Sequence, residues 1–325
     1  MDTEKEKTGS GAGHAIRARD VATVSVVIPF FNQMDKLRRT ADSLVNQQLR
    51  PSLVIFVDDL GNERLDPEIV SSLEEAGIST RLVVNERNLG PGGSRQAGFS
   101  LEPADTEYVL FLDSDDCVSQ TFLSSSVQTH KARPDIIATF GDSVNRDTGA
   151  SRVDRTRLPE NLLDGIVNVR PWGTGALLWK HSMIRGLEWM PWKNIEDTRF
   201  ELSAAMVNPR IAFAPDAVLY IDQDFTEGRL MTRNRSSDRQ EHFARRRNIF
   251  ESILMDFPFE RLGVTPGRYL EMAAYNLVYF FPEGPASYLR SMMRMFARGR
   301  HRSGLQMACR MPQYLFKWIR RQRMG

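Results

Sequence analysis

Three carboxylates follow the most apolar stretch of the sequence. Residues 108–112 are all apolar, and Asp113, Ser114, Asp115 and Asp116 come directly after them. Such a run is typical of a strand buried on both faces of a parallel sheet, and ligands bind beyond the carboxyl ends of these strands. Crowded carboxylates need a cation or a proton. Hard oxygen ligands favour Mg²⁺ or Mn²⁺ shared with substrate phosphates. The cluster therefore predicts a divalent metal site.

A simpler interpretation is that one of these acidic residues caps a helix. Asp and Ser are favoured at helix N-termini, and residues 121–131 have the composition of a helix. A cap needs only one carboxylate, so the other two favour the metal. Both interpretations stay open at this point.

The segments that must position this cluster alternate between strands and helices. Apolar and β-branched runs predict strands at 23–29, 53–57, 81–84, 108–112, 136–140 and 212–220. Helical periodicity predicts helices at 37–45 (with Asp35 as a cap), 67–76, 121–131 and from 194 onward. This alternation predicts an α/β fold with a mostly parallel sheet flanked by helices. Polar residues at the strand ends would then converge on one crevice that suits a nucleotide.

Two further segments carry candidate chemistry. The glycine-rich turn 88–93 precedes Arg95 and matches neither the Walker A sequence nor the dinucleotide fingerprint. It is either a close approach to a ligand, with Arg95 reaching a phosphate, or a plain turn before a helix. Asp197 is placed in or just before the first turn of the helix predicted from 194. It is either a catalytic base or a helix cap.

The bulk properties are those of an ordinary globular protein. The 325 residues carry a net charge of +2, and the only two cysteines, Cys117 and Cys309, lie far apart. This cysteine content fits a reducing, cytoplasmic setting. No uninterrupted apolar span is long enough to cross a bilayer. Residues 1–22 are predicted to be a disordered leader without a secretion signal.

The C-terminal part has a different character. From 285 to 325 there is no Asp or Glu, and arginines alternate with apolar residues at helical spacing. Basic amphipathic helices with aromatics suit an anionic membrane surface. A helix packed on the domain and a contact with an acidic partner are the alternatives. We expect no nucleic acid, because no known binding motif accompanies the charge.

Five motifs in sequence order resemble glycosyltransferase family 2, whose members have the GT-A fold. The resemblance covers about residues 24–234. Its motifs are the opening strand 24–32 ending in Pro29-Phe30-Phe31-Asn32, Val57-Asp58-Asp59, the turn from Asn88-Leu89-Gly90 to Arg95 and Gly98, Leu112-Asp113-Ser114-Asp115-Asp116 as the DxD motif, and Ile195-Glu196-Asp197.

The resemblance implies an inverting transfer from a nucleotide sugar, most simply a UDP- or dTDP-sugar, to an acceptor hydroxyl. Asp197 would be the general base. The nucleotide sugar would be bound by Pro29, Phe31, Asn32, Asp59, Arg95, Asp113 and Ser114. Asp115, with Asp113 and Asp116, would hold Mn²⁺ or Mg²⁺. The acceptor, a glycan, a lipid-linked sugar or a small molecule, would lie near Glu196, Trp172 and Gly175. The four tryptophans around this motif are either a sugar-stacking surface or core.

The resemblance, and the change of composition after the region that it covers, imply the domain limits. These are a GT-A domain at 23–235, with a nucleotide-sugar half (23–142) and an acceptor half (170–235), and a basic helical extension at 236–325. Leu60 stands where the family has glycine, and Asp222 or Asp224 stands near the place of a usual histidine. The motif and membrane helices of processive synthases are missing, which favours single additions by a cytoplasmic or membrane-peripheral enzyme. A non-catalytic sugar-binding protein and a sugar nucleotidyltransferase are the alternatives.

Overall fold

The structure, a computed structural model, describes residues 22–168, 170–222, 236–280 and 284–297, with single helical positions at 309, 312, 315 and 319. The predicted leader lies outside these residues except for Ala22, and so does most of the chain beyond 297.

The first half of the chain builds a parallel sheet, as predicted. Its strands are β1 (Val24–Phe30), β2 (Leu53–Asp58), β3 (Ser79–Val84) and β4 (Tyr108–Phe111). β1 pairs in parallel with β2 and with β4, and β2 pairs in parallel with β3. Every residue of β2 and β4 is buried, because helices cover both faces of the sheet. The carboxyl ends of these four strands therefore meet at one edge.

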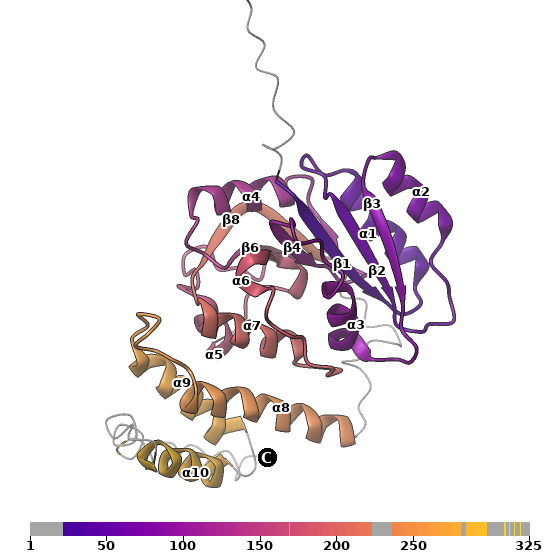
Figure 1. Cartoon of the computed structure of the whole chain (residues 1–325). Coiled ribbons are helices and arrows are strands. Elements are labelled where there is room, and N and C mark those ends of the chain that lie inside the picture. The colour runs from indigo at the N-terminus through magenta and orange to yellow at the C-terminus, as the bar shows by residue number, and fades with distance from the viewer. Residues whose placement is uncertain are drawn as a thin grey trace, which may run out of the picture.

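Helices connect these strands (Figure 1). They are α1 (Met34–Val45), α2 (Pro67–Glu75) and α3 (Gly90–Phe99), and a further helix, α4 (Phe122–Ala132), follows in the chain after β4. α3 lies close to the sheet because Gly98 has no side chain, and a Cβ there would lie 2.5 Å from Val27 Cγ1. The predicted cap of the first helix is wrong. Gln33 occupies the N-cap position in a left-handed conformation, and Asp35 lies in the first turn.

The second half inserts antiparallel strands. Its elements are β5 (Cys117–Val118), β6 (Ala138–Asn145), α5 (Leu162–Val167), η1 (Thr174–Ala176), β7 (Leu177–Lys180), α6 (His181–Ile184), α7 (Glu196–Val207) and β8 (Ile211–Ile221). In the described part of the chain the strand order is β3-β2-β1-β4-β7-β6-β8-β5. β7 runs antiparallel to β4 with Leu178 opposite Leu110. This pairing brings η1 to the carboxyl end of β4, beside the acidic turn.

Three of the four tryptophans of this half belong to the core. Trp172, Trp179 and Trp189 are 1%, 2% and 3% exposed. Trp189 stacks on Phe200 of α7, with ring centroids 4.3 Å apart. Of the two interpretations of these residues, core packing is the one that the structure supports for these three.

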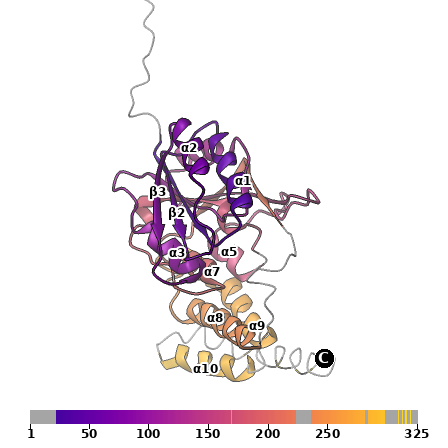
Figure 2. The same cartoon turned by 90° about the vertical axis from the view of Figure 1, so that its right-hand side faces the viewer.

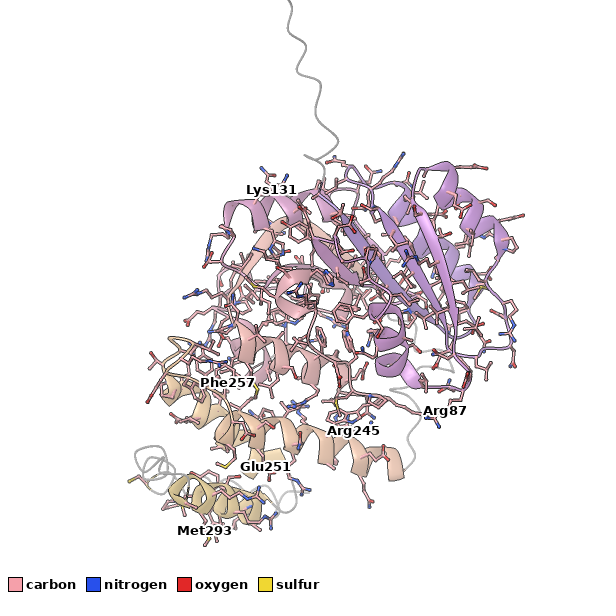
Figure 3. The ribbon with its side chains drawn as sticks, in the orientation of Figure 1. Arg87, Lys131, Arg245, Glu251, Phe257 and Met293 are labelled. Carbon is pink, nitrogen blue, oxygen red and sulfur yellow. The ribbon has the colours of Figure 1, made fainter. Side chains whose placement is uncertain are left out.

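Helices α8 (Ser236–Met255), α9 (Pro266–Phe280) and α10 (Gly284–Ala297) form a group on one side of the sheet domain (Figure 2). Side chains join α9 to α5: Asn161 Nδ2 donates to the hydroxyl of Tyr269 at 2.8 Å, and Arg268 pairs with Asp164 at 2.7 Å. On α8, Arg245 faces the sheet domain and lies over the ring of Trp192, 5.4 Å from its centroid (Figure 3). None of the helices described is both long and apolar enough to cross a membrane.

Candidate active site

The acidic turn after β4 is held in place by hydrogen bonds to its backbone carbonyl groups. The hydroxyl of Thr40 on α1 donates to the carbonyl oxygens of Ser114 (2.9 Å) and Asp116 (2.7 Å). The helix that follows, α4, has Thr121 at its N-cap and no side-chain cap hydrogen bond. The capping interpretation of the acidic cluster is therefore wrong.

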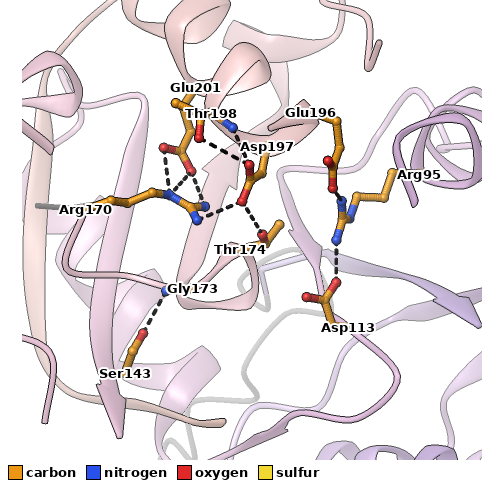
Figure 4. Close-up of polar contacts among 10 residues, drawn as sticks. All are labelled: Arg95, Asp113, Ser143, Arg170, Gly173, Thr174, Glu196, Asp197, Thr198 and Glu201. Carbon is orange, nitrogen blue, oxygen red and sulfur yellow. Dashed lines mark hydrogen bonds and ion pairs between the residues drawn. The ribbon is translucent and has the colours of Figure 1, made fainter. Parts of the chain in front are cut away.

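Arg95 joins the two halves of the site. Its guanidinium pairs with Asp113 through Nη2 and with Glu196 through Nη1 at 2.9 Å (Figure 4). The side chain is 3% exposed and lies over the ring of Trp189, 4.9 Å from its centroid. Burial alone would lower the pKa of Arg95, but the carboxylates of Asp113 and Glu196 raise it above its ordinary value. Arg95 is thus a fixed buried cation between a donor-side and an acceptor-side carboxylate.

Glu196 and Asp197 begin α7, as the sequence predicts. Ile195 precedes them with a φ of 61°, which is unfavourable for a β-branched residue. Burial, followed by repulsion from Asp197, raises the pKa of Glu196 to about 7 despite its pairing with Arg95. The strained turn therefore places two unlike carboxyl groups side by side.

Both carboxylate oxygens of Asp197 have partners. Oδ2 lies 2.7 Å from Arg170 Nη1 and accepts from the Thr174 hydroxyl at 3.3 Å. Oδ1 accepts from the backbone N–H of Thr198 at 2.6 Å. Burial alone would raise the pKa of Asp197, but Arg170, then Arg95 and the Thr198 N–H, outweigh burial and lower it. Asp197 is an ionised carboxylate whose side chain is 21% exposed.

Arg170, Thr174 and Glu201 are site residues that sequence reasoning missed. Arg170 pairs with Glu201 as well as with Asp197, and Glu201 is only 2% exposed. One signal was available. Asp197 and Glu201 are four residues apart on a predicted helix and share one face, so two like charges there indicate a cation between them.

The loops after β1 and β2 are tied together. Asn32, in a left-handed conformation with a φ of 61°, accepts hydrogen bonds from the backbone N–H groups of Asn62 (2.6 Å) and Glu63 (3.1 Å). Beside it, the ring of Phe31 is 49% exposed. Pro29, inside β1, pairs with Val57. Of the residues predicted to bind nucleotide here, Phe31 presents an open ring face, whereas Asn32 fastens the two loops.

The two aspartates after β2 have different partners. Asp59 accepts from the backbone N–H groups of Leu89 (2.7 Å) and Gly90 (2.9 Å) and from Asn85 Nδ2 (2.9 Å). It thereby anchors the start of α3. Asp58 is 1% exposed and pairs with Arg64 at 2.9 Å. Both carboxylate oxygens of Asp59 already accept hydrogen bonds from within the protein. Contact between Asp59 and a nucleotide base stays a prediction.

The glycine-rich turn makes room for the protein itself. A Cβ at Gly92 would lie 2.0 Å from the carbonyl oxygen of Met190 and 3.1 Å from Cβ of Glu196. The segment that leads into α7 therefore passes directly over the start of α3. This close approach is what places Glu196 within reach of Arg95.

The acidic turn offers oxygen ligands without a closed cage. Asp113 is engaged by Arg95, Asp116 is 5% exposed, and Asp115 is half-buried. Among the described residues, no three His, Cys, Asp or Glu side chains gather as a metal-binding group. Such a donor set fits a hard divalent ion that takes most of its ligands from a diphosphate and water.

Asp222, at the end of β8, is engaged by α1. Its Oδ2 lies 2.9 Å from Arg39 Nη2 and 3.6 Å from Lys36 Nζ. Asp224 lies outside the described residues. The replacement of the usual histidine by Asp222 or Asp224 stays a prediction.

On the acceptor side, Trp172 and Gly175 support η1. Trp172 lies against Phe140, with ring centroids 5.2 Å apart, and a Cβ at Gly175 would lie 2.8 Å from Leu112 Cδ1. The hydroxyl of Ser143 on β6 accepts from the backbone N–H of Gly173 at 2.9 Å. These contacts fix the position of Thr174, whose hydroxyl donates to Asp197. Contact of Trp172 or Gly175 with the acceptor stays a prediction.

Comparison with known proteins agrees with this architecture. Residues 25–185 match the sequence profile described as Glycosyl transferase family 2. The chain is 33% identical over 110 residues to the succinoglycan biosynthesis protein ExoW of Rhizobium meliloti (strain 1021), which covers 34% of each chain. The chain thus spans about a third of that relative's length.

Solved structures share the fold. One is S. aureus TarS 1–349 in complex with UDP-GlcNAc (TM-score 0.64, 17% identity, 93% of this chain and 92% of that chain). Another is the mannosyltransferase PcManGT from Pyrobaculum calidifontis in complex with GDP-Man and Mn²⁺ (TM-score 0.52, 16% identity, 91% and 86%). The predicted GT-A-type fold is thereby confirmed.

Proposed function

Because residues 25–185 belong to glycosyltransferase family 2, we propose that the protein transfers a sugar from a nucleoside diphosphate to an acceptor hydroxyl. The donor is most simply a UDP- or dTDP-sugar, and the transfer inverts the anomeric centre. The acceptor is a glycan, a lipid-linked sugar or a small molecule. ExoW is named for succinoglycan biosynthesis, and this supports a role in glycan assembly.

One observation carries the proposal. A single buried guanidinium, that of Arg95, pairs with Asp113 of the DxD motif and with Glu196 of the Glu-Asp motif. Asp113 and Glu196, 83 positions apart in the sequence (196 minus 113), are thereby held on one side chain. A donor bound at the acidic turn and an acceptor bound beside Asp197 would be neighbours.

The chemistry asked of the chain is one displacement. The acceptor hydroxyl oxygen bonds to the anomeric carbon, its proton passes to the carboxylate of Asp197, and the bond to the diphosphate oxygen breaks with both electrons on the leaving group. Asp197 suits the task because it is ionised and 21% exposed. Phe31, with its open ring, supports the nucleotide.

We propose that a divalent ion, Mn²⁺ or Mg²⁺, binds at Asp115 with the donor diphosphate. When bound, it would neutralise charge on the departing nucleoside diphosphate. Asp113 and Asp116 would shape the turn beside it. PcManGT, which shares the fold, is described as a complex with Mn²⁺, and this supports including Mn²⁺ in every assay.

The last helices support a membrane-peripheral location. On α10, Leu289 is 40% and Met293 63% exposed, and Met293 points outward (Figure 3). Tyr288 on the same helix is 1% exposed, so α10 packs one face inward and leaves an apolar stripe outside. Basic residues flank this stripe, as in helices that bind anionic lipid. We propose that this surface lies on the cytoplasmic face of a membrane, which suits two free cysteines.

Nucleoside diphosphate release from a panel of UDP-, dTDP- and GDP-sugars with Mn²⁺ tests the activity. Asp197→Asn is expected to lower turnover by about 10²–10⁴-fold with nearly unchanged donor affinity. Asp105→Asn, an exposed carboxylate at the other end of the sheet, is the control. Full activity in Asp197→Asn would refute the base assignment. Nucleotide binding without turnover on any donor would favour a binding protein.

Two measurements test the metal and the membrane. Asp115→Ala is expected to weaken donor binding in Mn²⁺, and equal affinity with and without the metal would refute this site.

Leu289→Ser with Met293→Ser is expected to reduce sedimentation with phosphatidylglycerol vesicles while donor affinity is kept. Unchanged sedimentation would exclude the α10 surface.

A further inference from the structure

Asp197 is one end of a three-residue charge cluster (Figure 4). Arg170 lies between two carboxylates of α7, 2.7 Å from Asp197 Oδ2 and 3.0 Å from Glu201 Oε1 through its Nε. Its Nη2 also contacts Glu201 Oε1 at 2.5 Å. A planar guanidinium can engage two carboxylates at once in this way, and a lysine cannot.

Glu201 is almost completely shielded from solvent, with 2% of its side chain exposed. Its only ion pair among the described residues is with Arg170, which lies outside α7 and four positions before Thr174. The loop that carries Arg170 is itself fixed, since the Gly173 N–H donates to Ser143 of β6 and the Thr174 hydroxyl donates to Asp197. The arrangement holds the carboxylate of Asp197 in one orientation from two sides.

We propose that Arg170 is a positioning residue for the transfer reaction: anchored by Glu201, it orients the carboxylate of Asp197 toward the acceptor. This inference rests on the proposed function, in which Asp197 accepts the acceptor's proton. Arg170 and Glu201 would then act on the reaction through Asp197.

The surrounding charges make the effect specific. Arg170 from the loop before η1 and Arg95 from α3 face Asp197 with positive charge. Glu196 and Glu201, both on α7, face it with negative charge. Arg170 is the nearest of the four, in direct contact, so its removal dominates the balance at Asp197.

Glu201 also matters after proton transfer. When Asp197 takes the proton it becomes neutral, and a partly buried guanidinium with Asp197 as its only partner would then lose its counter-charge. Arg170 keeps Glu201 as a partner at that stage. The second carboxylate thus allows Asp197 to change its charge without leaving Arg170 unpaired.

The experiment compares the titration of Asp197 in the whole protein with the pH dependence of kcat/KM. Carboxyl ¹³C NMR, with the Asp197 signal assigned by its loss in Asp197→Asn, follows the titration without substrate. In Arg170→Gln the pKa of Asp197 and the acid limb of kcat/KM are expected to rise by about 1 pH unit or more. In Glu201→Gln the removal of a negative charge is expected to lower the pKa of Asp197. Arg170→Lys is expected to restore much of the charge effect and little of the kcat.

Controls separate this from damage to the fold. Arg210→Gln, which removes a guanidinium whose side chain is 61% exposed and 3.9 Å from Asp135, is expected to change neither readout. Because Arg170→Gln leaves Glu201 buried and unpaired, Arg170→Gln with Glu201→Gln serves as the variant that keeps the charge balance. An unchanged Asp197 titration in Arg170→Gln, or a rise in both single variants, would overturn the inference. Absence of transfer by the unmodified protein would refute the proposed function but leave the NMR result interpretable.

Discussion

Nη1 of Arg95 donates a 2.9 Å hydrogen bond to Oε1 of Glu196, 101 positions further along the chain. The same guanidinium pairs with Asp113, so one side chain fixes the separation between the acidic turn and the first turn of α7. The side chains of Arg95, Asp113 and Glu196 are all wholly or partly removed from water. Removing any one of them would therefore leave an uncompensated charge in a buried environment.

Arg95→Lys is expected to lower transfer by about 100-fold, because an ammonium lacks the planar guanidinium whose two Nη atoms each pair with a different carboxylate, and the two motifs then lose their fixed spacing. Steady-state kinetics with saturating donor measure the effect. Arg81→Lys, on the exposed strand β3, is the matched control and is expected to leave the rate of transfer unchanged. Normal kcat in Arg95→Lys would show that the bridge does not set the geometry.

Gly92→Ala is expected to lower both activity and stability, the latter by about 1–3 kcal/mol, since its Cβ would lie 2.0 Å from the Met190 carbonyl oxygen and displace the segment that leads into α7. Thermal unfolding and turnover are the measurements. A Cβ at Gly186 meets nothing within 4 Å, so Gly186→Ala is expected to be neutral. Equal behaviour of the two variants would contradict the close approach.

Leu60→Gly is expected to stabilise the protein relative to Leu101→Gly by about 1–2 kcal/mol. Leu60 and Leu101 are each 43% exposed, but Leu60 alone of the two has a positive φ, of 61°. Glycine adopts this conformation without strain, and the related motif has glycine at this position. Urea unfolding gives the difference, and equal destabilisation of the two variants would show that Leu60 is unstrained.

Glu102→Gln is expected to stabilise the protein at pH 8 and to leave it unchanged at pH 5. Burial raises the pKa of Glu102 to about 7 from an ordinary value of 4.5. The folded state therefore binds more protons than the unfolded state between pH 4.5 and 7, and stability falls as the pH rises through that window. Glutamine resembles the protonated form, so the gain, on the order of 1–3 kcal/mol, requires high pH. Urea midpoints at both pH values measure it, and a gain of equal size at pH 5 would refute the assignment.

Much of the fold could be predicted from local patterns. The apolar runs before Asp58 and Asp113 predict β2 and β4 because a strand buried on both faces needs nothing else to be recognised. The pattern failed where tertiary pairing decides. Asp35 is a plausible cap in sequence, yet Gln33 occupies the N-cap position of α1, and both Gln33 and Asn32 before it have a positive φ. β6 runs to Asn145 because β8 pairs with it, although its sequence turns polar.

Local sequence patterns are enough to predict which residue types meet at the carboxyl edge of the sheet, because alternating strands and helices with short crossovers place the strands in parallel. The sequence also determined the family resemblance, and with it the separate motifs of Asp113 and Asp197. Which charged side chains pair with one another depends on the three-dimensional arrangement of the elements. Arg95 reaches across 101 positions to Glu196, and Arg170 crosses from a loop to Asp197 and Glu201. The reason is physical: a buried ion pair is set by distance in space and by desolvation, and neither quantity is written in sequence spacing.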